Sequence, residues 1–411
     1  MRTIAIIGAG FSGTMVAVHL LRAAPPSVER VLLIERSRRE IGGVAYETPS
    51  ASHTLNVPAG RMSAFEDDPD DFLRYVRRRE PSLTGGSFVP RREYGAYLAD
   101  TLDRARRESS LQLLRVSGQV VRLREETGGV VLSLDDGREL HADRAVLAIG
   151  NYPPSDLPVA DPGFYSSLRY ARDPWSPDAC ERDPGRPVLL LGTGLTMLDL
   201  ALALRDSDQQ APIYALSRRG LLPRAHRVAA KPPPHLDPPA TLDRWPDTAL
   251  GMLRELRREV REAAGERHDW REVVTSIRDD TPALWQRLSP AERERFLRHV
   301  RPYWETHRHR SSPETALAIE TMLAAGALRV IAGRLVGFEE DADGVTVSYR
   351  RRGRPELETL RVGKVINCTG PDTDLERVRE PLVASLLREG LVRPDPLGLG
   401  VDSDEAGRLL D

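Results

Sequence analysis

The feature that most constrains this chain is a glycine-rich loop at residues 8–13, which lies between an apolar run and a helical pattern. Residues 3–7 are short, apolar and β-branched, as is typical of a strand buried on both faces of a parallel sheet. The loop fits GxGxxG, and residues 15–21 carry apolar side chains at helical spacing. A second apolar run, 31–34, ends at Glu35, about 20 residues beyond the last glycine. This order of strand, loop, helix, strand and acid predicts a dinucleotide-binding unit.

Each part of this unit has a physical reason. Gly8 allows a tight turn, Gly10 leaves room for a pyrophosphate, and Gly13 lets the helix pack closely on the strand. The helix N-terminus presents free N–H groups to the phosphates. Glu35 can accept hydrogen bonds from a ribose diol but repels a 2′-phosphate, so FAD or NAD suits this site better than NADP. In the first half of the chain we expect cofactor contacts from Gly8, Gly10, Phe11, Ser12, Gly13, Glu35, Arg36, Met62, Val120 and Gly150.

Composition and charge exclude several classes of function. The chain has 411 residues, enough for two or three domains. Its 59 Lys and Arg against 61 Asp and Glu give a net charge of −2, which offers no argument for binding nucleic acid or an anionic membrane. Cys180 and Cys368 form no CxxC, which argues against a disulfide framework, a zinc site and a dithiol redox centre.

The amino-acid sequence also predicts neither a membrane span nor a signal peptide. No apolar run approaches the ~18 residues of a membrane span. A core strand is predicted almost at the N-terminus, which leaves no room for a signal peptide. We therefore expect a cytoplasmic protein with no membrane and no nucleic-acid partner.

Two segments after Glu35 carry candidate residues near a flavin. Small and amide-bearing residues gather at 42–46 and 53–59, which form either a surface loop or the bed of a flavin ribityl chain and ring. Tyr46 and Asn56 are our candidates beside the ring. Arg91, at the start of a predicted helix, is either a solvated charge or an active-site arginine.

The rest of the first half is mixed α/β. Amphipathic helices are predicted at 70–79 and 91–107, followed by a strand at 111–116. Residues 120–134 predict a hairpin meander. The apolar strand 144–150 ends in a glycine, which lets the backbone approach a ligand at the edge of a sheet.

A linker rich in Pro and Asp, 153–187, leads to a second dinucleotide unit. Strand 188–191 precedes the loop 192–197, in which Met197 replaces the third glycine, and strand 213–216 ends without an acid. Two arginines follow that strand. They are either solvated or placed to pair with a 2′-phosphate and stack on adenine, which would favour NADPH. In this unit we expect cofactor contacts from Gly192, Gly194, Leu195, Thr196, Ser217, Arg218 and Arg219.

Residues 224–312 predict a helical insertion, too long and too regularly patterned for a loop. Within it, Ser289 and Glu292 fit a capping box. The segment 301–310 is dense in aromatic and basic side chains. It forms either a clamp for an acidic substrate, with Arg308 as a candidate, or a basic helix end on the surface.

After the insertion the chain repeats the order of its first half. A helix at 314–325 and a strand at 328–332 precede a second meander at 334–350, and an apolar strand at 364–370 again ends in a glycine, Gly370. We interpret this repeat as an internal duplication. The predicted fold is α/β, with two doubly wound Rossmann-type dinucleotide-binding domains and a helical insertion.

The predicted domain division follows from this order. Residues 1–178 form the first part of an FAD-binding domain, and 179–333 form an NAD(P)H-binding domain with the insertion at about 224–312. Residues 334–411 form the meander and the return to the FAD-binding domain, whose C-terminal segment we expect to be incomplete.

Two fingerprints and two glycine-ended strands make the chain resemble the flavoproteins with two dinucleotide-binding domains. The loop 8–13 with Glu35 resembles their FAD site, and Gly150 and Gly370 resemble the glycines of their two ATG-type motifs. Their NADPH site is matched by Gly192, Gly194, Arg218 and Arg219.

A closer resemblance is to the bacterial FAD/NAD(P)-binding family of YdhS-like proteins, which has relatives that N-hydroxylate the amino group of aspartate. The segment 164–175 echoes the FxGxxxHxxxW pattern of Baeyer–Villiger monooxygenases but lacks its glycine and histidine, which argues against that chemistry. The closer resemblance is carried by residues 8–14, 43–46, 55–58, 62–63 and 307–310.

The resemblance implies a monooxygenase that binds FAD and NADPH. NADPH would reduce the flavin, and the reduced flavin would use molecular oxygen to oxygenate a small amino-acid-like substrate. Asn56 and Tyr46 would lie near the flavin, and Arg91 and Arg308 would bind a carboxylate. Two alternatives stay open: an NAD(P)H-dependent reductase that passes electrons to a quinone or protein acceptor, and a non-catalytic flavin-binding redox sensor whose helical insertion docks a partner.

Overall fold

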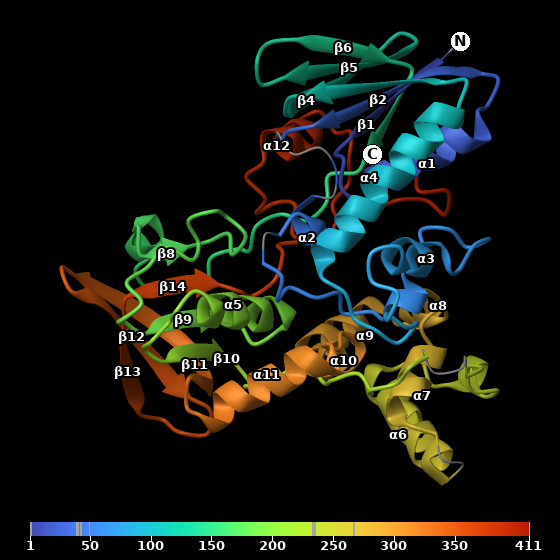
Figure 1. Cartoon of the computed structure of the whole chain (residues 1–411). Helices are drawn as coiled ribbons and strands as arrows, with labels where there is room; N and C mark the ends of the chain where they lie inside the picture. The colour runs from blue at the N-terminus through green and yellow to red at the C-terminus, as the bar shows by residue number, and fades with distance from the viewer. Residues whose placement is uncertain are drawn as a thin grey trace.

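The computed structural model describes residues 2–37, 41, 43–48, 50–231, 236–265 and 268–410. Figure 1 shows three parts: a first α/β domain at the top, a second at the lower left and a helical unit at the lower right. The predicted fold class is confirmed, since each α/β domain is built on a parallel sheet. None of the helices in the described part of the chain combines the length and apolar character needed to cross a membrane.

The first domain is built on four parallel strands. The central residues of the first two strands are short apolar runs and almost completely buried, as strands covered on both faces require. In spatial order the strands are β3 (Gln112–Ser117), β2 (Val28–Glu35), β1 (Arg2–Ile7) and β7 (Arg144–Leu147).

Two helices cover one face of this sheet, and a small antiparallel sheet together with one helix covers the other. Ile6 packs toward α1 (Phe11–Ala23) and α4 (Arg91–Glu108), whereas Ala5 and Ile7 pack toward a small antiparallel sheet and α12 (Pro381–Arg388). The three strands of the small sheet are β4 (Val120–Glu126), β5 (Gly129–Leu134) and β6 (Glu139–Ala142).

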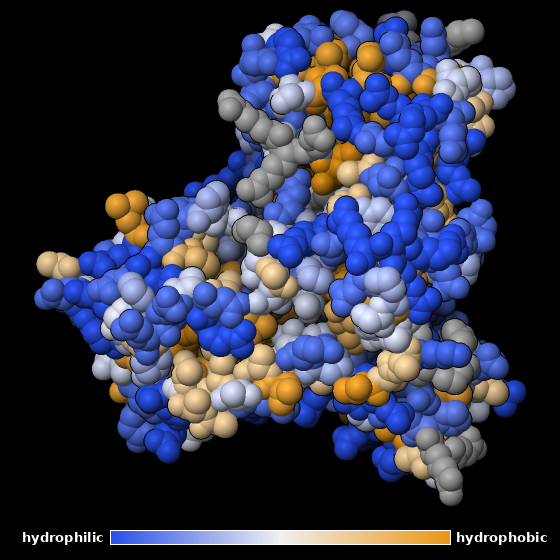
Figure 2. Space-filling view, in the orientation of Figure 1, coloured by the Kyte–Doolittle hydropathy of each residue, from blue (hydrophilic) through white to orange (hydrophobic). Residues whose placement is uncertain are grey.

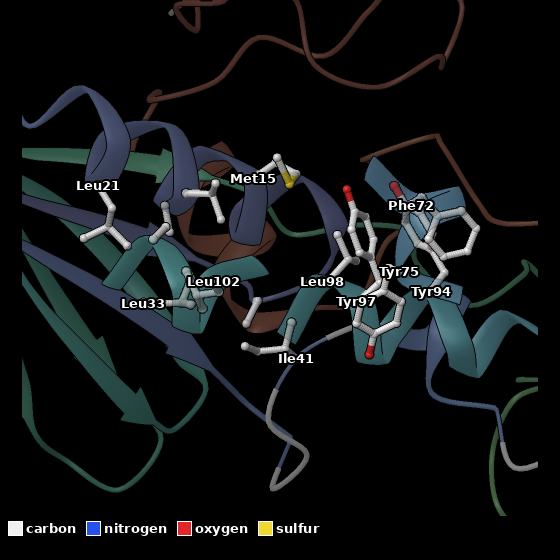
Figure 3. Close-up of a cluster of buried hydrophobic side chains, with 14 of the residues drawn as sticks. Met15, Leu21, Leu33, Ile41, Phe72, Tyr75, Tyr94, Tyr97, Leu98 and Leu102 are labelled. Atoms are coloured by element: carbon white, nitrogen blue, oxygen red, sulfur yellow. The ribbon is translucent and has the colours of Figure 1, made fainter. Parts of the chain in front are cut away.

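Figure 3 shows the core on the helical face, where Leu33 of β2 lies beside Leu102 of α4. Aromatic rings extend this core from α4 to α3 (Asp71–Arg77): the Phe72 ring lies 5.0 Å from that of Tyr94 and 5.1 Å from that of Tyr97, between centroids. These rings hold the N-terminal end of α4 beside the loop that follows β1. Two short helices lie in the same region, α2 (Gly43–Tyr46) and a 3₁₀ turn (Ala59–Arg61).

The second domain repeats the sheet of the first. The order β11-β10-β9-β14 corresponds to β3-β2-β1-β7, which confirms the internal duplication at the level of topology. Helices α5 (Leu195–Asp206) and α11 (Pro313–Ala324) pack on one face. The sheet order is β13 (Leu357–Val362), β12 (Gly344–Arg351), β11 (Leu328–Asp341), β10 (Ile213–Ser217), β9 (Val188–Leu191), β14 (Lys364–Asn367) and β8 (Tyr170–Ala171).

The domain boundaries in the structure differ from those predicted from the sequence. β8 already pairs with β14, so the first part of the first domain ends before residue 170 rather than at 178. β14 pairs with β9, so the chain returns to the first domain only after Asn367, with α12, rather than at 334. β11 also runs unbroken to Asp341, because its second half pairs with β12 and carries the meander within the same sheet.

The insertion leaves and rejoins the second domain at one place, where Ala225 pairs with Ser311. Ser289 caps its helix as predicted, accepting from the Glu292 N–H at 3.4 Å. The Glu292 carboxylate does not complete the capping box; it accepts from the Ala249 N–H at 2.9 Å and ties two helices together. The helices are α6 (Ala249–Gly265), α7 (Trp270–Ser276), α8 (Thr281–Arg287), α9 (Pro290–Arg295) and α10 (Arg301–Arg308), the last two joined by a π-turn (Phe296–Val300).

Candidate functional site

A cleft of about 550 Å³ lies at the carboxyl edge of the first sheet and reaches the second domain. Its volume falls within the range of small-molecule sites. Figure 2 shows the molecular outline indented between the first domain and the second. Of the residues expected at a site, the lining includes Gly8, Gly10, Phe11, Ser12, Glu35, Arg36, Tyr46, Arg91, Val120, Gly150, Thr196 and Gly370.

The first glycine loop has the geometry of a phosphate cradle. Gly8 has φ +107°, and a Cβ there would lie 2.3 Å from the Ala148 carbonyl oxygen. A Cβ on Gly13 would lie 1.9 Å from the Gly8 carbonyl oxygen, so Gly13 is required for packing and does not line the cleft. A Cβ on Gly10 would meet no protein atom within 4 Å. Gly10 therefore opens on the space in front of the α1 N-terminus, where an anion is stabilised by free N–H groups.

Glu35 ends β2 on the wall of the cleft. One carboxylate oxygen accepts from the Ala9 N–H at 2.8 Å and the other from the Ser37 N–H at 2.9 Å. These bonds hold the acid beside the glycine loop, where a ribose would follow a pyrophosphate. Arg36 pairs with Glu380 at 3.1 Å, which ties the segment preceding α12 to this end of the cleft.

The second glycine loop repeats the geometry of the first. Gly192 has φ +110°, and a Cβ there would lie 2.5 Å from the Cys368 carbonyl oxygen, as Gly8 does with Ala148. Gly194, like Gly10, has no protein atom within 4 Å of a Cβ position. Met197, fully buried, takes the place of the third glycine. Thr196 is the residue of this loop that also lines the cleft, so the two loops face a common space.

The end of β10 differs from the end of β2 as the sequence predicted. Ser217 replaces the acid, and its hydroxyl lies 2.9 Å from that of Thr193 in the glycine loop. Arg218 is exposed. Arg219 lies over the Tyr303 ring, 5.7 Å from its centroid, so the helical insertion contacts this strand end. None of these three residues lines the cleft, and they lie beside the second glycine loop.

Arg91 lines the cleft and joins the two domains. Its guanidinium forms an ion pair with Asp199 of α5 at 2.7 Å and donates to the Thr54 carbonyl at 3.1 Å. Burial raises the pKa of Asp199 to about 6, although Arg91 opposes that rise. His53 contacts the Asp199 carbonyl at 3.1 Å, and burial together with Arg91 lowers its pKa to about 4. Arg91 is therefore held in an ion pair between the domains and is mostly buried, so it is not a solvated charge at a helix start.

Tyr46 and Trp175 are aromatic residues in the lining of the cleft. Tyr46 lies with its ring centroid 4.8 Å from that of Tyr94, and burial raises the pKa of the Tyr46 hydroxyl. Trp175, from the linker between the domains, belongs to the same lining and packs edge-on against His53, with 5.7 Å between ring centroids. Trp175 was not among the site residues predicted from the sequence. The signal that could have identified it is an aromatic side chain within a Pro- and Asp-rich linker.

Three other predicted site residues lie outside the cleft. Met62 packs against the core of the first domain. Asn56 accepts a hydrogen bond at its carbonyl oxygen from His226 Nε2 at 3.0 Å, if that nitrogen carries the proton. Arg308 lies in the helical insertion, where burial, together with Arg278, lowers its pKa. The structure therefore does not bring Asn56 and Arg308 together with Tyr46 and Arg91.

Comparison with known proteins agrees with this geometry. Residues 5–152 match the model of the FAD-NAD(P)-binding family. No curated protein sequence matches the chain significantly.

Solved structures share the fold at low sequence identity. The reduced ornithine hydroxylase of Pseudomonas aeruginosa matches with a TM-score of 0.61 at 16% identity, over 98% of this chain and 90% of its own. The ornithine N-hydroxylase of Kutzneria sp. 744, with reduced FAD, NADP⁺ and L-ornithine, matches with a TM-score of 0.59 at 16% identity, over 97% of this chain and 86% of its own. The thioredoxin reductase of Lactococcus lactis matches with a TM-score of 0.53 at 13% identity, over 100% of this chain and 87% of its own. The chain thus has an FAD-NAD(P)-binding domain and the overall fold of flavin-dependent oxidoreductases.

Proposed function

We propose that this protein is an FAD- and NADPH-dependent monooxygenase that N-hydroxylates a small amino-acid-like substrate. The observation that carries the proposal is that one cleft is lined both by the first glycine loop and by Thr196 of the second. A flavin and a nicotinamide held by the two loops would meet in that cleft. Proximity of the two cofactors is what hydride transfer between them requires.

The residues of the first site fit FAD. Gly10 leaves an open cradle for a pyrophosphate, and Glu35 is held where a ribose diol would lie. Tyr46 and Trp175 would flank the ring and exclude water from it. When bound, the flavin supplies hydride acceptance and oxygen activation, and the protein supplies position and a dry environment.

The cysteines favour oxygenation over disulfide reduction. Cys180 and Cys368 are both free, and neither lines the cleft. Burial raises the pKa of both thiols, which keeps them protonated and poorly nucleophilic. A dithiol reductase needs a reactive thiol pair beside its flavin. The proposal therefore gives the chain the fold of a thioredoxin reductase without a dithiol in its reaction.

Arg218 should set the preference for NADPH at the second site. Replacing it with alanine is expected to reduce the NADPH-over-NADH preference in flavin reduction by roughly 10- to 100-fold, because a charge-assisted bond to phosphate contributes about 1.5–3 kcal/mol. Stopped-flow reduction with each cofactor measures this ratio. Arg106→Ala, an equally exposed arginine on α4, is the control and should leave it unchanged. An unchanged ratio in Arg218→Ala would show that Arg218 does not contribute to the NADPH site.

Product analysis tests the proposed reaction. The FAD-loaded protein is supplied with NADPH and ¹⁸O₂ and with amino acids of different charge. The proposal expects NADPH oxidation that one substrate accelerates, and a product that carries one labelled oxygen atom on nitrogen. NADPH oxidation with electron transfer to a quinone, but no labelled product with any substrate, would favour a reductase instead. Bound FAD with negligible NADPH oxidation would favour the redox sensor.

A further inference from the structure

Four tyrosines lie ring beside ring between the cleft and α3: Tyr46, Tyr94, Tyr97 and Tyr75, here called the tyrosine row. The ring centroids of Tyr46 and Tyr94 are 4.8 Å apart. Those of Tyr94 and Tyr97 are 5.5 Å apart, and those of Tyr97 and Tyr75 are 5.4 Å apart. Figure 3 shows the last three rings grouped where α3 meets α4. All three separations are typical of aromatic rings in contact, so the row is unbroken.

The two ends of the row differ in their surroundings. Tyr46 lines the cleft. The two middle rings are only 2% and 0% exposed, so a soluble reductant does not reach them. Tyr75 is 9% exposed, and the exposed guanidinium groups of Arg78 and Arg79 lie over its ring, 5.1 Å and 5.8 Å from the centroid. The row therefore connects the cleft with a cationic position near the surface.

Packing alone does not account for the hydroxyl groups of the row. Phe72 is 0% exposed and lies 5.0 Å from the Tyr94 ring and 5.1 Å from the Tyr97 ring, so the same core also accepts phenylalanine. Phenylalanine fills nearly the same volume without the cost of burying a hydroxyl. Burial raises the pKa of Tyr94, and it raises the pKa of Tyr97 to about 12. These buried phenols indicate a chemical role besides packing.

Tyr97 has a proton acceptor inside the core. Its hydroxyl donates to Asp71 Oδ2 at 2.7 Å and accepts from the Ala64 N–H at 3.2 Å. Asp71 is 6% exposed and is paired with Arg104 at 3.2 Å, which holds the carboxylate in place. A phenol loses an electron more easily when its proton can move to a base at the same time. Asp71 therefore makes Tyr97 the most readily oxidised of the two middle rings.

We propose that the tyrosine row is an electron path through which a small anionic reductant at the surface repairs one-electron oxidation in the cleft. The oxidants it would remove are radicals derived from molecular oxygen, which arise where a flavin meets oxygen. The exposed guanidinium groups beside Tyr75 would attract an anionic reductant such as ascorbate. The proposal rests on a flavin at the first site, and it holds whether that flavin oxygenates a substrate or reduces another acceptor.

Electrons and protons balance along the row. The oxidant in the cleft gains one electron from Tyr97 through the rings of Tyr94 and Tyr46, and the Tyr97 hydroxyl proton shifts to Asp71. Tyr75 then returns an electron to Tyr97, which recovers its proton from Asp71, while Tyr75 releases its own proton to solvent. The reductant finally gives Tyr75 one electron and one proton. The net result is a one-electron oxidation of the reductant and a one-electron reduction in the cleft.

A light flash on the FAD-loaded protein tests the path without NADPH or turnover, because photoexcited flavin oxidises nearby aromatic side chains by one electron. Wild-type protein is expected to form a tyrosyl radical that decays faster as ascorbate is added, followed by transient absorption and electron paramagnetic resonance. Tyr75→Phe and Tyr97→Phe should lose the dependence on ascorbate. Asp71→Asn should slow formation of the radical by roughly 10-fold or more, as loss of a charge-assisted hydrogen bond implies.

Tyr165→Phe is the matched control, because the Tyr165 hydroxyl donates to the Leu157 carbonyl at 2.6 Å outside the row. It removes a hydrogen-bonded hydroxyl and should leave the dependence on ascorbate unchanged. Tyr97→Phe also removes a buried hydrogen bond, so circular dichroism checks its fold. Tyr75→Phe, at the outer end of the row, carries the test on its own if Tyr97→Phe does not fold.

Two results would overturn the proposal. One is an equal dependence on ascorbate in wild type and Tyr75→Phe. The other is a radical confined to tryptophan, which would place the oxidation at Trp175, beside His53 and away from the row. The expected radical behaviour in a protein that oxygenates no substrate would sustain the path while rejecting the proposed function. Oxygenation without that behaviour would reject the path alone.

Discussion

A valine in place of Gly10 is expected to weaken FAD binding by roughly 100-fold or more, while leaving the protein folded. A Cβ at this position meets no protein atom within 4 Å, and its φ of −67° suits any residue, so the substitution causes no strain. Its methyl groups would instead occupy the cradle in front of the α1 N-terminus. A pyrophosphate could no longer approach the backbone N–H groups there. Fluorescence titration with FAD measures the loss, and circular dichroism checks the fold.

The internal duplication supplies a matched control. Gly194 has the same open surroundings in the second loop, so Gly194→Val should leave FAD affinity near the wild-type value and instead weaken NADPH. If both valine variants lose FAD equally, the assignment of one cofactor to each loop is wrong. If Gly10→Val binds FAD normally, the cradle does not hold the pyrophosphate.

Replacing Arg91 with glutamine should destabilise the protein by about 3 kcal/mol at neutral pH, because it leaves the buried carboxylate of Asp199 unpaired. Arg91 and Asp199 have side chains only 16% and 7% exposed and lie 2.7 Å apart. Urea unfolding measures the change. Arg92→Gln, on the same helix but 52% exposed, is the control and should cost less than about 1 kcal/mol. Equal effects of the two substitutions would contradict a buried interdomain ion pair.

The same pair predicts a pH dependence. The folded-state pKa of Asp199 is raised from 3.8 to about 6, so between these values the folded protein binds more protons than the unfolded chain. The contribution of Asp199 to stability is therefore greatest below about pH 4 and is lost as the pH rises through about 6. Without Arg91 the pKa rises further, so the cost of Arg91→Gln should shrink at acidic pH. Asp199→Asn should remove this component of the pH profile.

Local patterns sufficed to predict the parts of the site that depend on neighbours in sequence. The two glycine loops, Glu35 at a strand end and the arginines after β10 are all consequences of short-range order. The apolar strands were equally predictable, because burial on both faces leaves few choices besides Val, Ile, Leu and Ala. The duplication then placed Gly370 in the lining of the same cleft as Gly150, 220 positions away.

Long-range pairings were not predictable in this way. Arg91 and Asp199 lie 108 positions apart, and no pattern in either helix signals the other. Arg308 was proposed as a carboxylate ligand for its composition alone, and the effect of burial and Arg278 on its pKa became apparent only in three dimensions. Met62 was expected at the cofactor because of its place in the chain, but its side chain packs against the core of the first domain instead. In each case tertiary packing decides the role of the side chain.

Anaerobic mixing of the FAD-loaded protein with NADPH tests the central claim most directly, namely that two duplicated units hold two cofactors over one cleft. We expect the flavin absorbance to bleach with one equivalent of NADPH per flavin, faster than with NADH, and the Gly194→Val variant to retain bound flavin that NADPH no longer reduces. A wild-type flavin that stays bound and oxidised in the presence of either nicotinamide cofactor would contradict the claim.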